Sequence, residues 1–390
     1  MFGMGHIVHG TCERAAVSID PREVVGWFDR VRRDLPWRRP EVSAWQILVS
    51  EFMLQQTPVA RVEPIWRDWI ARWPTPSATA AAGAADVLRA WGKLGYPRRA
   101  KRLHECATVI AAEHGDVVPE DVEVLLTLPG VGSYTARAIA CFAYQQPVPV
   151  VDTNVRRVVA RAVHGLADAG NPSAKRDEAD VAALLPDDDT APRFSAGLME
   201  LGALVCTARN PKCGVCPLSH CAWRTAGFPP STAPVKKVQK YAGTDRQVRG
   251  RLMDVLRASD APVTRAQLDV AWLTDTAQRD RALDSLLVDG LVEQTEDGRF
   301  ALAGEGANAG AGAPSRGARG RMQPLRSRAD NSEGANAGAG APSRGARGRM
   351  QPLRSRADNS EGADAGAGAP SRGARGRMQP LRSRADNSEG

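Results

Sequence analysis

The chain has 390 residues, 43% of them apolar, and a formal net charge of +8. This length and the nine tryptophans allow one or two sizeable cores, and no stretch approaches the ~20 apolar residues of a membrane span. The charge does not mark the folded part as a general polyanion binder: residues 307–390 contain 15 arginines and seven acidic residues, which leaves 37 basic and 37 acidic residues in 1–306.

The N-terminal segment 1–20 lacks both a basic region and an apolar run, so we expect a flexible N-terminus, no export signal and a cytoplasmic protein. From residue 21 onward the apolar spacing is helical. Val24, Val25, Phe28 and Val31 share one stripe of a helix expected over 22–33, and Ser43 is placed to cap a helix over 44–56. Further helices are expected over 84–92, 98–113, 121–127, 133–144, 153–163 and 194–205. The predicted fold class is therefore all-α.

A glycine-rich hairpin precedes the helix expected at 133–144. Gly130 and Gly132 lie in Leu-Pro-Gly-Val-Gly, where bare backbone N–H groups and the helix dipole favour phosphate binding; an ordinary helix connection is the alternative. Twenty residues further on, Asp152 is placed to begin a helix. It is either a simple N-cap or a carboxylate that the helix N-terminus keeps ionised, as stabilising a sugar cation requires.

Four cysteines lie within sixteen residues, at Cys206, Cys213, Cys216 and Cys221. Disulfide frameworks belong to small secreted domains, which this chain does not resemble in size. Structural zinc sites usually pair two short Cys-x2-Cys knuckles, and here there is only one. The spacing favours an iron–sulfur cluster and leaves zinc as an alternative.

The remaining sequence divides into three parts. Pro and Lys residues over 226–243 indicate a linker. Residues 244–304 predict helices over 245–257, 264–272 and 276–289 and a hairpin around Asp297-Gly298, which suggests a winged-helix-like unit that either binds DNA or packs against the main body. The tail, 305–390, consists mainly of three 28-residue repeats beginning at 307, 335 and 363; without aromatic or β-branched residues it is expected to be disordered.

Taken together, the hairpin, the aspartate and the cysteine cluster resemble the endonuclease III superfamily of helix-hairpin-helix DNA glycosylases over about residues 20–225. The resemblance implies a two-lobed catalytic domain over 21–225, with a six-helix barrel at about 43–149 and a cluster lobe formed by 21–42 and 150–225. It also implies a 4Fe–4S cluster on the four cysteines. One departure is that four residues, where the family usually has five, separate Cys216 from Cys221.

Three motifs narrow the resemblance to the MutY-type adenine DNA glycosylases. Ser50–Thr57 matches the family pattern S-E-x-M-L-Q-Q-T, and Leu35–Arg38 and Leu94–Tyr96 match two further motifs. Tyr134 occupies the position where bifunctional relatives carry a lysine, and a tyrosine cannot form a Schiff base. The resemblance thus implies a monofunctional enzyme of base excision repair, which removes adenine paired with 8-oxoguanine or guanine in double-stranded DNA.

The catalytic roles implied by the family fall on Glu51 and Asp152. Glu51 would protonate adenine at N7, and its apolar neighbours Phe52, Met53 and Leu54 would raise its pKa by desolvation. Asp152 would stabilise the positive charge at C1′. Tyr134 and Asn154 would support Asp152 and the sugar intermediate.

The resemblance assigns further residues to substrate contacts, with structural alternatives. Pro97 and Phe194-Ser195 depart from the family pattern. Core packing is the alternative for Trp37, Leu54 and Val59, and a solvated helix charge is the alternative for Glu200. The phosphate contacts would be Arg209 and Lys212, between the first two cysteines. The residues near the base opposite adenine would be Gln56, Thr57, Leu94 and Tyr96. The adenine pocket would be lined by Arg33, Trp37, Arg38, Leu54, Val59 and Glu200.

Most relatives carry a C-terminal Nudix-like domain that reads 8-oxoguanine through a histidine-containing loop. Here 85 residues separate Cys221 from the repeats and no histidine follows His220, so we expect that domain to be missing. A monomer that acts on the bacterial nucleoid is expected. Two alternatives stay open: a thymine glycosylase acting on G·T mispairs, and a non-enzymatic DNA-binding protein with a metal-stapled helical domain.

Overall fold

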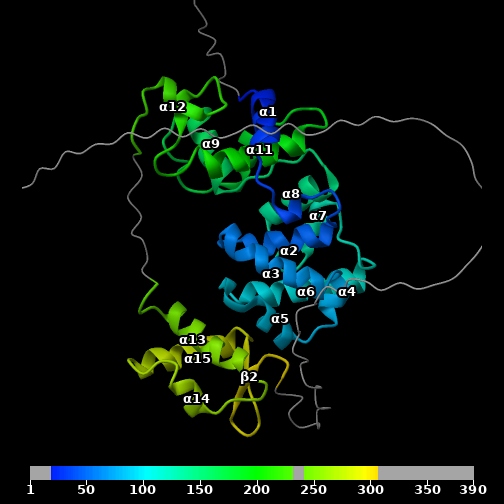
Figure 1. The fold of residues 1–390 in the computed structure, drawn as a ribbon, viewed down its shortest axis with the longest axis vertical. Helices are drawn as coiled ribbons and strands as arrows, with labels where there is room; N and C mark the ends of the chain where they lie inside the picture. The colour runs from blue at the N-terminus through cyan, green and yellow to red at the C-terminus, as the bar shows by residue number, and fades with distance from the viewer. Residues whose placement is uncertain (1–18, 232–240, 306–390) are drawn as a thin grey trace, which may run out of the picture. The chain divides into compact units, whose positions relative to one another are not determined.

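The computed structural model describes residues 19–231 and 241–305. The predicted repeat tail, except Glu305, and the N-terminal segment, except its last two residues, lie outside these ranges. Within the described residues no helix combines the length and the apolar character needed to span a bilayer. The helical class expected from the sequence is confirmed, and the helices before the C-terminal part gather into two lobes (Figure 1).

The first lobe is a helical barrel formed from the middle of the catalytic region (Figure 1). Its core contains Trp69 and Trp91, whose rings meet edge to face at a centroid distance of 6.1 Å, together with Phe52 and other apolar side chains from all of these helices. The helices are α2 (Ala44–Leu54), α3 (Val59–Arg72), α4 (Pro76–Ala80), α5 (Ala84–Trp91), α6 (Arg98–Glu113), α7 (Val122–Thr127) and α8 (Ser133–Tyr144).

The second lobe combines the first helix with the helices that follow the barrel (Figure 1). Helix α11 packs on both α1 and α9, and these contacts enclose a separate core. Gly202 permits the approach to α9, since an added Cβ would lie 2.6 Å from the Asn154 Cβ. The helices are α1 (Pro21–Val31), α9 (Thr153–Ala162), α10 (Ala174–Ala182), α11 (Ala191–Leu204) and α12 (Ala222–Thr225).

The C-terminal part contains three helices and a two-stranded antiparallel sheet. The strands are β1 (Val292–Gln294) and β2 (Phe300–Leu302), paired with Val292 opposite Leu302. Gly298 in the turn has φ +77°, which glycine adopts without strain. The helices are α13 (Asp245–Ala258), α14 (Arg265–Asp269) and α15 (Thr276–Val288). The apolar side chains of this part are continuous with the barrel core, and Arg89 of α5 pairs with Glu305.

Candidate active site

A cleft of about 1370 Å³ is lined by residues of both lobes. Its lining includes Glu51 from α2, Tyr134 from α8 and Asp152 at the start of α9. The three residues expected to carry the chemistry are therefore brought to one cavity, although they are far apart in the sequence. A cleft of this size has room for a nucleotide that has left a duplex.

Glu51 lies on the buried side of α2, where only 7% of its surface is exposed. The helix begins with a capping box formed by Ser43 and Gln46. Burial, helped by the negative charge of Asp152, raises the pKa of Glu51 to about 7, although a hydrogen bond from the Tyr134 hydroxyl and the charge of Arg38 oppose the shift. Near neutral pH the carboxyl group therefore holds a proton in a large fraction of molecules, as a general acid requires.

Asp152 is the N-cap of α9. Its carboxylate accepts a hydrogen bond from the Val155 backbone N–H at 2.7 Å and one from the Asn154 side chain at 2.7 Å. These hydrogen bonds lower the pKa of Asp152, but burial has the larger effect and raises it above its usual value. The sequence predicted the opposite, a carboxylate that the helix N-terminus keeps ionised. Arg157 donates to Asn154 at 2.8 Å and so fixes the amide that faces the carboxylate.

Glu200 is fully buried and forms ion pairs with two arginines. Arg33 binds it through the side chain at 2.7 Å and through the backbone N–H at 3.0 Å, and Arg38 binds it at 3.0 Å. Burial alone would raise the pKa of Glu200, but the hydrogen bonds from Arg33 and the charge of Arg38 lower it to about 2. The alternative of a solvated helix charge is therefore wrong: Glu200 is an ionised group that holds two arginines at the cleft.

The other residues expected in the adenine pocket also lie along the cleft. Leu54 and Val59, at the end of α2 and the start of α3, belong to its lining. Trp37 belongs to the lining and to the barrel core, with its ring against Trp66 at 5.7 Å. The core alternative and the pocket expectation are thus compatible for this tryptophan, since it packs against Trp66 and also lines the cleft.

The residues expected opposite adenine separate into two groups. Gln56, with φ +56°, and Thr57 line the cleft. The Leu94 side chain is buried in the barrel core, and its carbonyl accepts a hydrogen bond from Thr57 at 3.3 Å. Tyr96 is 43% exposed and adopts φ +48°. Neither Leu94 nor Tyr96 belongs to the cleft lining, so the segment borders the cleft through Thr57.

Arg99 was not indicated by the sequence, yet it joins these segments. Its guanidinium donates to the Phe52 and Met53 carbonyls at 2.8 and 3.0 Å and to the Thr57 hydroxyl at 2.9 Å. Burial lowers its pKa to about 10, which leaves it charged at neutral pH. Its position three residues after Tyr96 is the only sequence signal, and its partners become apparent only in three dimensions.

The glycine hairpin lies against the catalytic helix. Gly130 has φ +79°, and an added Cβ would lie 2.9 Å from the Phe52 ring and 2.7 Å from the Arg102 Cβ. Gly132 is the N-cap of α8, a position open enough for a backbone N–H to reach a ligand. Both glycines line the cleft, as expected for a hairpin that holds a phosphate beside the reacting nucleotide.

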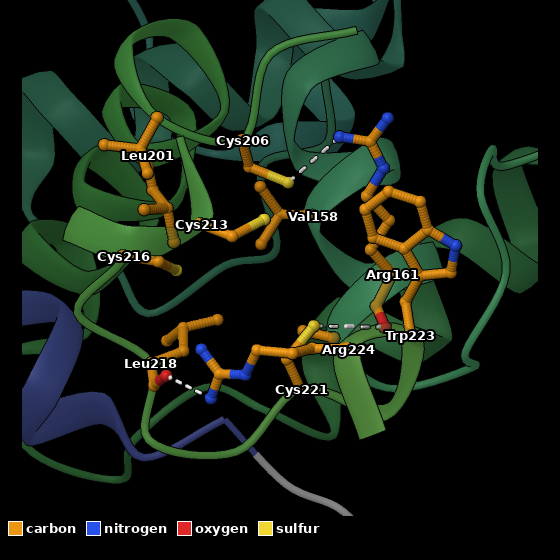
Figure 2. A pocket seen from close by; sticks show the side chains of 12 residues that line it. Val158, Arg161, Leu201, Cys206, Cys213, Cys216, Leu218, Cys221, Trp223 and Arg224 are labelled. Carbon is orange, nitrogen blue, oxygen red and sulfur yellow. Dashed lines mark hydrogen bonds between the residues drawn. The ribbon is translucent and has the colours of Figure 1, made fainter. Parts of the chain in front are cut away.

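The four clustered cysteines line one small cavity in the second lobe (Figure 2). All four are free thiols, which excludes the disulfide alternative for them. Arg161 donates to the Cys206 sulfur at 3.4 Å, and its own carbonyl accepts from Cys221 at 3.6 Å. Four thiols around one cavity, supported by a neighbouring arginine, fit the ligand set of an iron–sulfur cluster.

The two basic residues between the first two cysteines are exposed. Arg209 and Lys212 lie on the surface of the loop, whereas Cys206 and Cys213 at its ends are partly buried. The thiols thus anchor the loop at both ends. The loop is placed to offer positive charge to a phosphate backbone.

Comparison with known proteins agrees with this geometry. Residues 49–182 match the HhH-GPD superfamily of base excision DNA repair proteins, and residues 206–220 match the iron–sulfur binding domain of endonuclease III. The fold and the site thus define a helix-hairpin-helix base excision glycosylase with a 4Fe–4S cluster.

Three relatives specify the family. An adenine DNA glycosylase of Mycolicibacterium smegmatis is 77% identical over 290 residues, covering 74% of this chain and 98% of the relative. One of Mycobacterium tuberculosis is 72% identical over 303 residues, covering 78% and 100%. A human adenine DNA glycosylase is 40% identical over 212 residues, covering 52% and 39%. The chain belongs to the adenine DNA glycosylase family. The family, enzyme class and cluster expected from the sequence are confirmed.

Proposed function

We propose that this enzyme is a monofunctional glycosylase that removes adenine paired with 8-oxoguanine or with guanine, with Glu51 as the acid and Asp152 as the stabilising carboxylate. The observation that carries the proposal is Glu51: a buried carboxyl with a pKa of about 7, in one cleft with Tyr134 and Asp152. An acid and a second carboxylate around one nucleotide supply what cleavage of a glycosidic bond needs.

In this mechanism Glu51 transfers its proton to N7 of the extruded adenine. The N-glycosidic bond then breaks, its electron pair leaves with the base, and the Asp152 carboxylate stabilises the cation at C1′. Water adds to C1′ and gives its proton back to Glu51, which leaves an abasic site and restores the acid. Asn154 holds the Asp152 carboxylate in place at 2.7 Å throughout these steps.

Tyr134 supports the monofunctional part of the proposal. It is hydrogen-bonded to Glu51, and burial raises its pKa well above the usual range, so the hydroxyl stays protonated as a donor. Without an amine at this position no Schiff base forms with the sugar, and the product strand stays intact until the abasic site is cleaved by other means.

The cleft and the surface around it suggest how DNA is held. Gly130 and Gly132 contact the phosphates beside the extruded nucleotide, and Arg209 and Lys212 contact the backbone further away. The bound cluster supplies structural support to this loop. The proposal includes a cytoplasmic monomer that acts on the DNA of the bacterial nucleoid. It also includes domain boundaries near residues 225 and 244.

Four duplexes test the substrate. With A or T opposite 8-oxoguanine or G, we expect single-turnover excision from both A-containing duplexes, faster opposite 8-oxoguanine, and none from the T-containing ones. Thymine has no N7 for Glu51 to protonate. Product is read after alkaline cleavage, and omission of alkali should leave the strand intact. Thymine release would favour the G·T alternative, and equal or faster excision opposite G would contradict the preference.

The pH dependence follows from Glu51. Its protonated form predominates below a pH of about 7 and is lost above it, so the single-turnover rate should fall about tenfold per pH unit on the alkaline side. The raised pKa of Asp152 predicts a second decline at acidic pH, where the carboxylate takes up a proton. A rate that stays constant well above neutrality would show that Glu51 does not act as the acid.

A further inference from the structure

An alternating series of aromatic rings and guanidinium groups connects the barrel to the C-terminal part. The Arg99 guanidinium carbon lies 5.0 Å from the Trp91 ring centre and 5.6 Å from the Tyr96 ring centre. The Arg246 guanidinium carbon lies 6.0 Å from Tyr96 and 5.2 Å from Tyr241. Arg246 also donates to the Tyr96 hydroxyl at 3.0 Å. We call Trp91, Arg99, Tyr96, Arg246 and Tyr241 the stacked series.

Tyr96 combines an exposed side chain with an unfavourable backbone conformation. Its side chain is 43% exposed, its φ is +48°, and it follows Gly95 at φ +85°. A non-glycine residue in the left-handed region carries a conformational cost that its surroundings must offset. Arg99 supports the ring from the barrel, and Arg246 binds it from α13. Trp91 and Arg99 fix the loop backbone by donating to the Gly95 carbonyl at 2.9 and 3.1 Å, and Arg246 adds a contact of the C-terminal part to the Tyr96 side chain.

Helix α13 is itself held in place against the barrel by charged contacts. The Asp289 carboxylate, just after α15, pairs with Arg98 of α6 and with Arg249 of α13. Lys101 donates to the Asp289 carbonyl at 3.2 Å. Because the side chains beneath these contacts share the barrel core, α13 is not free to drift, and Arg246 meets Tyr96 in a defined position.

We propose that Arg246 is a specificity-determining positioning residue, which holds Tyr96 where it can contact the base opposite the extruded adenine. The inference rests on the proposed function and on the family resemblance, which assigns Thr57, Leu94 and Tyr96 to the surroundings of that base. The C-terminal part thereby takes part in reading the mispair through a residue of the barrel. Arg246 acts on affinity and discrimination, while bond cleavage stays with Glu51 and Asp152.

A simpler role for an exposed arginine is attraction to phosphate. That role depends on charge and not on the ring, so any exposed arginine of α13 should provide it to a similar degree. Arg251 is the matched control, because it lies on the same helix and is exposed like Arg246. A conservative variant, Arg246→Lys, keeps the charge and part of the cation–π contact.

The experiment measures duplex affinity and single-turnover rate at saturating enzyme for the full-length, cluster-containing protein. We expect Arg246→Ala to weaken binding to the 8-oxoG·A duplex about tenfold, to weaken binding to G·A less, and to leave the saturated rate within about twofold. Arg251→Ala should retain both affinities, and Arg246→Lys should recover part of the loss. Adding Arg246→Ala to Tyr96→Leu should cause no further loss, since Arg246 acts through that ring.

Two results would overturn the inference: equal losses for Arg246→Ala and Arg251→Ala, or full additivity of the Tyr96 and Arg246 changes. If the wild-type enzyme showed no preference for 8-oxoguanine, the proposed specificity would fail. The role of Arg246 would then be tested on the G·A duplex, by the comparison with Arg251→Ala and by the double-mutant cycle of Tyr96 and Arg246. Thermal unfolding of each variant checks that the fold is intact.

Discussion

Glu51→Gln should lower single-turnover excision of adenine opposite 8-oxoguanine by about a thousandfold or more. Glutamine keeps the size and the polarity of the side chain and removes the transferable proton. The Tyr134 hydroxyl still has an acceptor, so the cleft should keep its shape. Duplex affinity should therefore stay within a few-fold of wild type, and the loss should appear in the rate at saturating enzyme, measured from quenched time courses.

Glu63→Gln is a matched control, since Glu63 is a partly exposed carboxylate on α3 that pairs with Arg67. Its excision rate should equal the wild-type rate.

The pH dependence of stability provides a second check on Glu51. Because burial raises the pKa of Glu51 from 4.5 to about 7, the native state favours its protonated form; that stabilisation is complete below about pH 4.5 and is lost as pH rises through about 7. Glutamine cannot ionise, so the variant should unfold above the wild-type temperature in alkaline buffer. A wild-type rate for Glu51→Gln would remove the acid from the mechanism.

Asp152→Asn should lower excision by about a hundredfold to ten-thousandfold with binding retained. Asparagine is as good an N-cap as aspartate, so it can still accept from the Val155 backbone N–H, and α9 should stay intact. The change therefore removes the negative charge and little else. The measurement is again the single-turnover rate at saturating enzyme, compared with the affinity for the same duplex.

Asp121 offers a control with the same local geometry. It is the N-cap of α7 and accepts from the Glu123 and Val124 backbone N–H groups, at an exposed position outside the cleft lining. Asp121→Asn should leave excision unchanged. If both cap variants had the same small effect, Asp152 would be an ordinary helix cap, and the carboxylate that stabilises the sugar would have to be sought elsewhere in the cleft.

Several helices were predicted from the sequence close to their observed bounds, and four others were not, although one of the missed helices, α4, begins with a Thr75 cap. The helix expected over 98–113 is α6 with the same bounds, and the one over 133–144 is α8. Helices α3, α4, α10 and α12 were missed. Pro64 lies inside α3 and Pro58 directly before it, and proline usually ends a helical pattern, which masked this 14-residue helix.

The candidate site was likewise predicted only in part from the sequence. Glu51, Asp152 and the cysteines belong to motifs with fixed spacing, and the structure gathers each set around one cavity. The role of Glu200 was ambiguous from the sequence, because the two arginines that pair with it lie more than 160 residues away in the chain. The reach of Arg246 to Tyr96, over 150 residues, depends likewise on packing that no local pattern records. The winged-helix assignment of 244–304 stays a prediction.

Glu51 and Asp152 lie on helices that pack into different cores. Helix α2 is placed by the packing of the barrel and helix α9 by the packing of the second lobe, and residues of both lobes line the cleft. Catalysis therefore depends on the relative position of the two lobes as much as on either carboxylate. A substitution deep in one core that tilts the lobes apart would abolish excision while leaving both carboxylates, the cluster and most of the stability in place. Inactive variants far from the cleft should accordingly be judged by the alignment of the lobes before they are attributed to misfolding.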